Sequence, residues 1–129
     1  MFTVEQIESA HAKVKSGADF PVYIQEIKEF GVRSFETWVK DSHTEYVGEN
    51  GYTTKSQPQY DELTVENTVD KELFVNQLKS HQRGETDYMK FCEDCARTGI
   101  EKWIVNLDQF TCIYYDKSGN KILIEEIPH

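Results

Sequence analysis

The sequence predicts an α+β domain of two tandem α-α-β-β-β units, with helices packed on one face of a mainly antiparallel sheet. Three observations support this fold. Apolar residues recur at helical spacing in four segments, strand signals follow each pair of helices, and the second half of the chain repeats the pattern of the first half at a constant offset. The 129 residues form a single domain by length. One unit is too small to bury its own sheet face, so the two units should share one core.

Two helices open the first unit, which we place at about residues 3–56. Thr3 begins a capping-box pattern, and the apolar stripe that follows predicts a helix to about Ser16, with Gly17 as its stop. The second helix opens at Asp19, a good N-cap, and its apolar positions have the i, i+3, i+4, i+7 spacing of an amphipathic helix. A glycine follows its last apolar turn.

The second unit, at about residues 70–127, opens with two further helices. The third helix is predicted to run from about Asp70 to Arg83 and the fourth to begin at Asp87, and a glycine again follows each of them. The polar stretch between the units, about residues 57–69, reads as a connection in which residues 63–66 form a short additional strand.

Three strands are predicted in each unit, and matching turn dipeptides separate them. The strands lie within residues 32–39, 43–48 and 51–54 of the first unit and within 100–107, 109–116 and 120–127 of the second. The turn dipeptides are Asn50-Gly51 and Ser118-Gly119. The segment 100–107 is apolar on both faces, which indicates either a central place in the sheet or a contact between subunits.

The two units match when the sequence is shifted by 68 positions without a gap, as Asp19 meeting Asp87 illustrates. The aligned positions share an N-cap, an apolar helix stripe, a C-cap glycine and a turn glycine, which are four separate physical requirements. Ten pairs carry the match, and four are identities: Asp19/Asp87, Phe20/Tyr88, Tyr23/Phe91, Ile24/Cys92, Ile27/Cys95, Gly31/Gly99, Val32/Ile100, Phe35/Trp103, Tyr46/Tyr114 and Gly51/Gly119. We interpret the match as an internal duplication.

Composition narrows the classes of function. The chain has 14 basic and 23 acidic residues and a net charge of −9, so direct binding to a nucleic-acid backbone is disfavoured. No apolar run is long enough to span a membrane, and the first residues lack a secretory pattern. The three cysteines are odd in number and lack the spacing of a disulfide framework, so we expect them to be reduced thiols. We therefore expect an acidic cytoplasmic protein without membrane contact, either a monomer or a homodimer.

Four segments resemble a known family over nearly the whole chain. They are FTVEQIESAHAKVKSGADFPVYIQEIKEFGV, DSHTEY, YMKFCEDCARTGIEKW and TCIYYDKSGNKI. They are similar to the YdfO-like and YbcV-like proteins of enterobacterial prophages, which are grouped as a domain of unknown function. The resemblance implies an α+β fold and a bacterial or prophage origin. It implies no reaction and no catalytic residues.

Cys92 and Cys95 form a CxxC pair, for which three interpretations stand. A redox dithiol prefers a helix N-terminus, and this pair lies inside a predicted helix beside acidic residues. A zinc site needs further ligands, and no second CxxC exists. The pair takes the register of two buried isoleucines of the first unit, so we favour small buried hydrophobes and predict no metal and no cofactor.

A polar cluster in the first unit is the candidate ligand site. Glu36 and Trp38 share one face of a predicted strand, and His43 and Glu45 share a face of the next strand. If the two strands pair, all four side chains lie on the open side of the sheet, where a histidine beside a carboxylate suits a general base. The alternative is an ordinary solvated sheet face. His11, near the apolar stripe of its helix, is predicted to be a partly buried structural histidine.

Two classes of function follow. The leading hypothesis is a non-enzymatic accessory or protein-interaction domain that acts on an unidentified protein partner through its acidic surface or an uncovered sheet face. The alternative is a small-molecule-binding protein or enzyme that uses Glu36, Trp38, His43 and Glu45. No nucleophile motif or metalloprotease motif is present in the sequence, so the sequence favours a protein that is not an enzyme.

Overall fold

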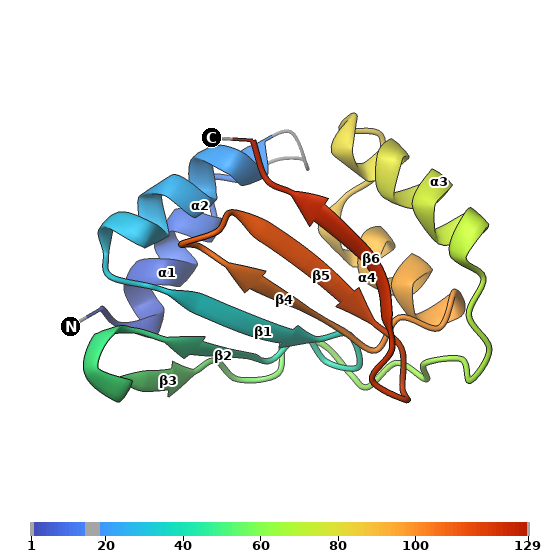
Figure 1. The fold of residues 1–129 in the computed structure, drawn as a ribbon, viewed down its shortest axis with the longest axis horizontal. Helices are drawn as coiled ribbons and strands as arrows, with labels where there is room; N and C mark the ends of the chain where they lie inside the picture. The colour runs from blue at the N-terminus through green and yellow to red at the C-terminus, as the bar shows by residue number, and fades with distance from the viewer. Residues whose placement is uncertain (1, 15–18, 129) are drawn as a thin grey trace.

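The computed structural model describes residues 2–14 and 19–128 and has a mixed α+β fold (Figure 1). Its helices are α1 (Val4–His11), α2 (Phe20–Glu29), α3 (Lys71–Gln82) and α4 (Tyr88–Arg97). Its strands are β1 (Ser34–Trp38), β2 (Thr44–Val47), β3 (Thr53–Lys55), β4 (Lys102–Asn106), β5 (Thr111–Tyr115) and β6 (Lys121–Glu126), with a 3₁₀ turn, η2, at Glu49–Gly51. The four predicted helices and the three strands predicted in each unit are present in these residues.

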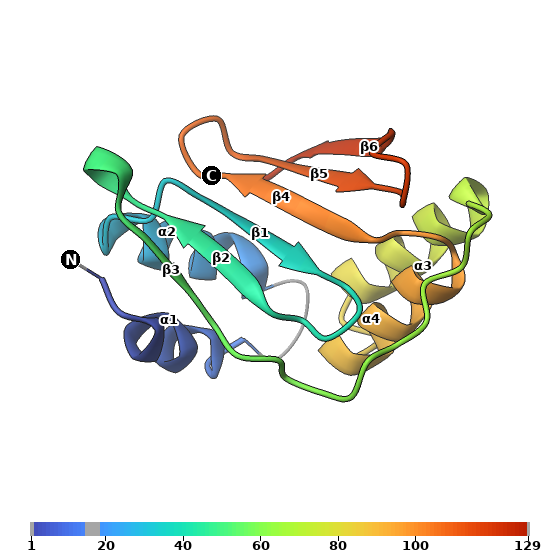
Figure 2. The same ribbon diagram turned by 90° about the horizontal axis from the view of Figure 1, so that it is seen from below.

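The strands form one open sheet in the order β3-β2-β1-β4-β5-β6, and every neighbouring pair is antiparallel. The two halves of the chain meet in the middle, where β1 pairs with β4 over the register Ser34↔Asn106 to Trp38↔Lys102. Of the two interpretations of residues 100–107, the structure shows the central place in the sheet. Figure 2 shows the helices on one face of the sheet, with the other face uncovered.

Side-chain caps fix the starts of α1, α3 and α4, and Asp19 takes the predicted N-cap position of α2. The Gln6 backbone N–H donates to Thr3 Oγ1 at 3.2 Å, and the Thr3 N–H donates to Gln6 Oε1 at 2.8 Å, which completes the capping box. Asp70 accepts from the backbone N–H of Leu73 at 3.1 Å, and Asp87 accepts from that of Lys90 at 2.8 Å. These bonds satisfy amide groups that have no partner inside the helix.

Helix α1 is shorter than predicted, since it ends at His11 rather than near Ser16. After His11 the hydrogen bonds tighten to the three-residue spacing of a 3₁₀ turn, with Lys13 N–H donating to the Ala10 carbonyl and Val14 N–H to that of His11. The stop predicted at Gly17 lies outside the described residues.

The short strand predicted at residues 63–66 is wrong, because this segment is irregular. Its backbone bonds instead to a loop and to the end of a helix: Leu63 N–H donates to the Lys40 carbonyl, and Glu66 N–H to that of Ala96, at 2.7 and 2.8 Å. The connection is thus tied to both halves of the molecule rather than being added to the sheet.

Each helix pair buries its apolar stripe against the helix-facing side of the sheet. The strands β1, β4 and β5 alternate between buried and half-buried side chains, as expected for a sheet with one covered face. Gly99 follows α4 at φ +86°, and a Cβ there would lie 2.7 Å from the Thr68 carbonyl oxygen. Glycine is therefore needed both for the backbone angle and for the close passage of the connection. No helix in the described ranges is long and apolar enough to cross a membrane.

Candidate functional site

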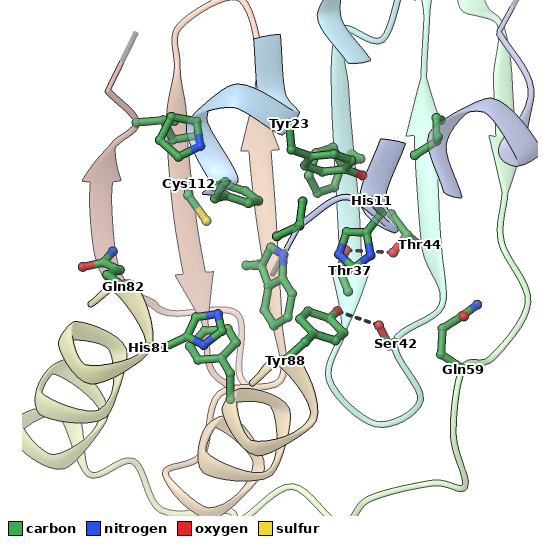
Figure 3. A pocket seen from close by; sticks show the side chains of 18 of the residues that line it. His11, Tyr23, Thr37, Ser42, Thr44, Gln59, His81, Gln82, Tyr88 and Cys112 are labelled. Atoms are coloured by element: carbon green, nitrogen blue, oxygen red, sulfur yellow. Dashed lines mark hydrogen bonds between the residues drawn. The ribbon is translucent and has the colours of Figure 1, made fainter. Parts of the chain in front are cut away.

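A cavity of about 900 Å³ lies where the two helix pairs separate above the sheet. We call it the seam cavity and define it by its lining residues: Ile7, Glu8, His11, Ala12, Val14, Phe20, Pro21, Tyr23, Phe35, Thr37, Ser42, Thr44, Tyr46, Ser56, Gln59, Tyr60, Leu78, His81, Gln82, Tyr88, Met89, Phe91, Trp103, Cys112, Tyr114, Glu125, Glu126, Ile127 and Pro128. Side chains from α1, α2, α3 and α4 form its walls, and β1, β2, β4, β5 and β6 contribute to its floor. Figure 3 shows Gln59 and Gln82 toward opposite ends of the cavity.

The lining is rich in aromatic rings, which come from the helix-facing positions of the strands, from α2 and α4, and from the connection between the halves. Nine aromatic residues contribute to it: Phe20, Tyr23, Phe35, Tyr46, Tyr60, Tyr88, Phe91, Trp103 and Tyr114. Trp103 lies at the centre of this group, with ring centroids 5.5 Å from Phe91 and 6.2 Å from Tyr114. Such packed rings form rigid apolar walls for a ligand.

Hydroxyl groups line the floor near β1 and β2. Thr37 and Thr44 are directly opposite in the sheet, and their Oγ1 atoms lie 2.8 Å apart in a buried hydrogen bond. The Ser42 and Tyr88 hydroxyls share a hydrogen bond of 2.6 Å, which joins the β1–β2 turn to α4 (Figure 3). Polar groups of this kind orient a ligand inside a mostly apolar pocket.

Two histidines face the cavity from opposite helix pairs. The His11 ring of α1 meets Tyr23 and Tyr88 edge-on, at centroid distances of 5.3 and 5.4 Å. The His81 ring of α3 stacks on Phe91 at 4.5 Å. Burial lowers the pKa of both histidines below the usual 6.5. Both rings are therefore neutral at pH 7 and add no positive charge to the lining.

Carboxylates lie on the lining as well. Glu125 of β6 is paired in register with the buried Cys112, so it lies on the helix-facing side of the sheet. The Gln82 side-chain amide of α3 donates to Glu125 Oε1 at 2.9 Å. Burial raises the pKa of Glu125, and the bond from Gln82 and the nearby charge of Lys79 oppose this shift only in part. Glu125 is thus a carboxylate that is partly withdrawn from water without an ion pair among the described residues.

The four side chains of the predicted cluster lie on the opposite, uncovered face of the sheet. Glu36 and Glu45 are opposite one another in the β1–β2 register, and the Trp38 and His43 rings stack at 4.6 Å with 4° between their planes. Glu36 pairs with Lys102 at 2.6 Å, whereas the Lys55 ammonium lies 3.8 Å from Glu45. The structure brings the four together as a ridge of stacked and ion-paired side chains, and none of them lines the seam cavity.

Asp41 belongs to this cluster and was missed by the sequence reasoning. Its Oδ1 lies 2.5 Å from His43 Nδ1 and also accepts the His43 backbone N–H at 3.0 Å. Burial pushes the pKa of Asp41 upward, but the hydrogen bonds from His43 and the charge of Lys40 outweigh it and lower the pKa overall. The sequence signal for Asp41 was the spacing Asp-x-His in a tight turn. An aspartate in such a turn commonly accepts a hydrogen bond from the backbone N–H two residues later.

The predicted burial of Cys92 and Cys95 is confirmed, since both are fully buried in α4. Burial raises the pKa of Cys92 to about 11, and that of Cys95 also lies well above its usual range. Protonated thiols are poor nucleophiles and poor metal ligands. Within residues 2–14 and 19–128, no group of three or more histidine, cysteine, aspartate or glutamate side chains has the arrangement of a metal site.

Comparison with known proteins shows which family the chain belongs to. A family model described as "Protein of unknown function (DUF1398)" matches residues 8–126. The chain belongs to this family. It is also similar to uncharacterized proteins of Mycobacterium bovis and Mycobacterium tuberculosis, each 25% identical over 97 residues, which cover 74% of this chain and 59% of the relative. The DUF1398 chain thus spans less than two thirds of the length of these relatives.

The lining of the seam cavity was not foreseen from the sequence of this DUF1398 protein. Tyr23, Trp103 and Tyr114 have the spacing of ordinary core residues, and nothing in that spacing distinguishes a wall from a packed interior. His11 was expected to be a partly buried structural histidine, and the structure places it half-buried at the cavity. The signals available in the sequence were a histidine beside the apolar stripe of its helix and a glutamate, Glu125, within the strand predicted at 120–127.

Proposed function

We propose that this DUF1398 protein binds a small molecule in the seam cavity. The observation that carries the proposal is the cavity of about 900 Å³ with nine aromatic residues in its lining. This volume lies within the range of about 300 to 1,000 Å³ that is typical of ligand pockets, and ligand pockets are likewise mostly apolar with a few polar groups. Thr37, Ser42 and Thr44 supply such groups on the floor.

A non-enzymatic accessory role is part of this proposal, because binding alone requires neither a nucleophile nor a metal. The proposed site differs from the one predicted from the sequence. The proposal agrees with the alternative hypothesis that the ligand is a small molecule. It differs in the site, because the seam cavity lies on the covered face of the sheet.

A fluorescence titration with Nile red, a neutral apolar dye, tests the proposal. Met89→Trp places a larger side chain on the lining, whereas Leu73→Trp is the control, since Leu73 has a similar exposed fraction of 44% against 37% but does not line the cavity. We expect saturable one-to-one binding to the wild type and to L73W, and affinity about tenfold weaker in M89W. Absence of saturable binding, or equal affinity in both variants, contradicts the proposal. Circular dichroism shows whether each variant is folded.

A second candidate is acid–base chemistry at the predicted cluster of Glu36, Trp38, His43 and Glu45. The observation that favours it is the Asp41–His43 pair at 2.5 Å, because a carboxylate on one ring nitrogen orients a histidine as a general base. Hydrolysis of p-nitrophenyl acetate by the wild type, His43→Ala and Asp41→Asn at pH 7.5 tests it. Reduced rates are expected in both variants, and equal rates in all three proteins contradict this role.

The duplication, the prophage origin and the cytoplasmic location stay predictions. The duplication is supported by the repeated element order α-α-β-β-β and by the strand order of the sheet. In each half the third strand lies at the edge, the second strand next to it and the first strand at the centre. If it is correct, residues 70–127 expressed alone should form a homodimer, with a second β4 in place of β1. A monomeric or unfolded fragment would count against equivalent units.

A further inference from the structure

The charge of the seam cavity indicates what class of molecule it accepts. Among the described residues of the lining, Glu8, Glu125 and Glu126 are acidic, and none is lysine or arginine. Both lining histidines are neutral at pH 7 for the reason given above. An anionic ligand would therefore meet no lysine or arginine among the described residues of the lining, in a chain whose net charge is −9.

Glu125 is the carboxylate best placed to meet a ligand. It lies on the covered face of the sheet, opposite Cys112, and is held by the side chain of Gln82. A carboxylate in a partly dry site is stabilised by a positive charge more strongly than a carboxylate in water, because the surroundings screen the attraction less. The described residues provide no ion pair for it, so a cationic group on the ligand would supply what the protein lacks.

The aromatic lining favours the same class of ligand. The faces of tryptophan and tyrosine rings carry negative charge density and attract organic cations, and the attraction is larger where water is excluded. Tyr114 lies two residues after Cys112 on the same buried face of β5, and Cys112 is opposite Glu125, so the ring and the carboxylate line the same part of the cavity. Trp103 and Phe91 continue the aromatic surface from there.

We propose that the seam cavity binds a lipophilic organic cation, with its charged group beside Glu125 and its apolar part against Tyr114, Trp103 and Phe91. This inference rests on the small-molecule binding proposed above and adds the ligand class. Quaternary ammonium and phosphonium compounds with aromatic or alkyl substituents have the required chemistry.

A pair of probes with the same shape and opposite charge tests the proposal by isothermal titration calorimetry. Tetraphenylphosphonium is the cation and tetraphenylborate is the anion. We expect the cation to bind at least tenfold more tightly than the anion to the wild-type chain. Equal or tighter binding of the anion overturns the ligand class, while saturable binding of Nile red would still support the proposed function. If none of the three probes binds, the proposed function itself fails.

Two variants of equal charge separate Glu125 from the general acidity of the protein. Glu125→Gln and Glu29→Gln each remove one negative charge, but Glu29 is exposed on α2 and does not line the cavity. We expect E125Q to weaken binding of tetraphenylphosphonium about tenfold and E29Q to change it less than twofold. Nile red affinity should remain unchanged in E125Q, which shows that the cavity is intact. Equal effects of the two variants on the cation overturn the assignment to Glu125.

Discussion

His11 of α1 and Tyr88 of α4 meet edge-on across the seam cavity, with 5.4 Å between their ring centroids. The contact joins the helix pair of the first half to the helix pair of the second half. Tyr88 also reaches the β1–β2 turn through its hydrogen bond to Ser42. The cavity wall therefore depends on side chains from both halves, and changes at His11 or Tyr88 should affect stability and binding together.

The two cavity histidines should make the protein less stable in mild acid. Burial lowers the pKa of His11 and His81 in the folded chain, while the unfolded chain takes up protons near pH 6.5. Their contribution to the free energy of unfolding is therefore complete above about pH 6.5 and is lost as the pH falls below it. Urea unfolding at pH 7.5 and 5.5 measures this loss.

The double variant His11→Phe/His81→Phe keeps rings at both positions and removes their titration. We expect its stability to fall less between the two pH values than that of the wild type. Glu125, whose pKa is raised by burial, acts with the opposite sign and is common to both proteins. An equal loss in wild type and variant would show that these histidines do not set the acid sensitivity.

Tyr88→Phe should destabilise the fold through loss of one hydrogen bond. The hydroxyl bond to Ser42 is 2.6 Å long and partly buried, and its removal leaves the Ser42 hydroxyl without this partner. We expect a loss of about 1 to 2 kcal/mol in the free energy of unfolding, measured by urea denaturation. Tyr115→Phe is the control, since Tyr115 is half-buried on the uncovered face and contacts Lys102 through its ring. Equal losses in both variants would contradict this role of the Ser42 bond.

The helices and strands could be predicted because each depends on a local signal. Thr3, Asp70 and Asp87 cap helices whatever the rest of the chain does, and alternation within a strand decides which side chains share a face. The end of α1 could not be predicted, because the apolar stripe continues to Val14 although the helix stops at His11. Beyond the helix, Val14 is partly buried against the core.

The candidate site also has a part that local patterns predict and a part that depends on contacts between distant segments. Period-two alternation was enough to put Glu36 and Trp38 on one face, and the turn then brought His43 beside them. The ion pair from Lys102 to Glu36 depends on β1 pairing with β4, which are distant in the sequence. The seam cavity depends on the separation between two helix pairs, and no residue spacing within either pair encodes that separation.

The cysteines should be unreactive in the folded protein. Burial raises the pKa of Cys92 to about 11 and that of Cys112 to about 12, and Cys95 is fully buried. At pH 8 we expect 5,5′-dithiobis(2-nitrobenzoic acid) to label the native chain at least a hundredfold more slowly than the chain in guanidinium chloride, where all three thiols react. Rapid labelling of native Cys92 or Cys95 would instead support the redox interpretation of the CxxC pair.

Removal of a positive charge near Glu125 should strengthen the binding of an organic cation. Lys79 lies on α3 close enough to lower the pKa of Glu125, so it also repels a cation at that carboxylate. We expect Lys79→Gln to raise the affinity for tetraphenylphosphonium about two- to threefold, a modest gain because solvent screens an exposed lysine. Lys71→Gln, which makes the same change at the other end of α3, should leave the affinity unchanged. If calorimetry finds no gain in K79Q, or an equal gain in K71Q, the cation does not bind beside Glu125.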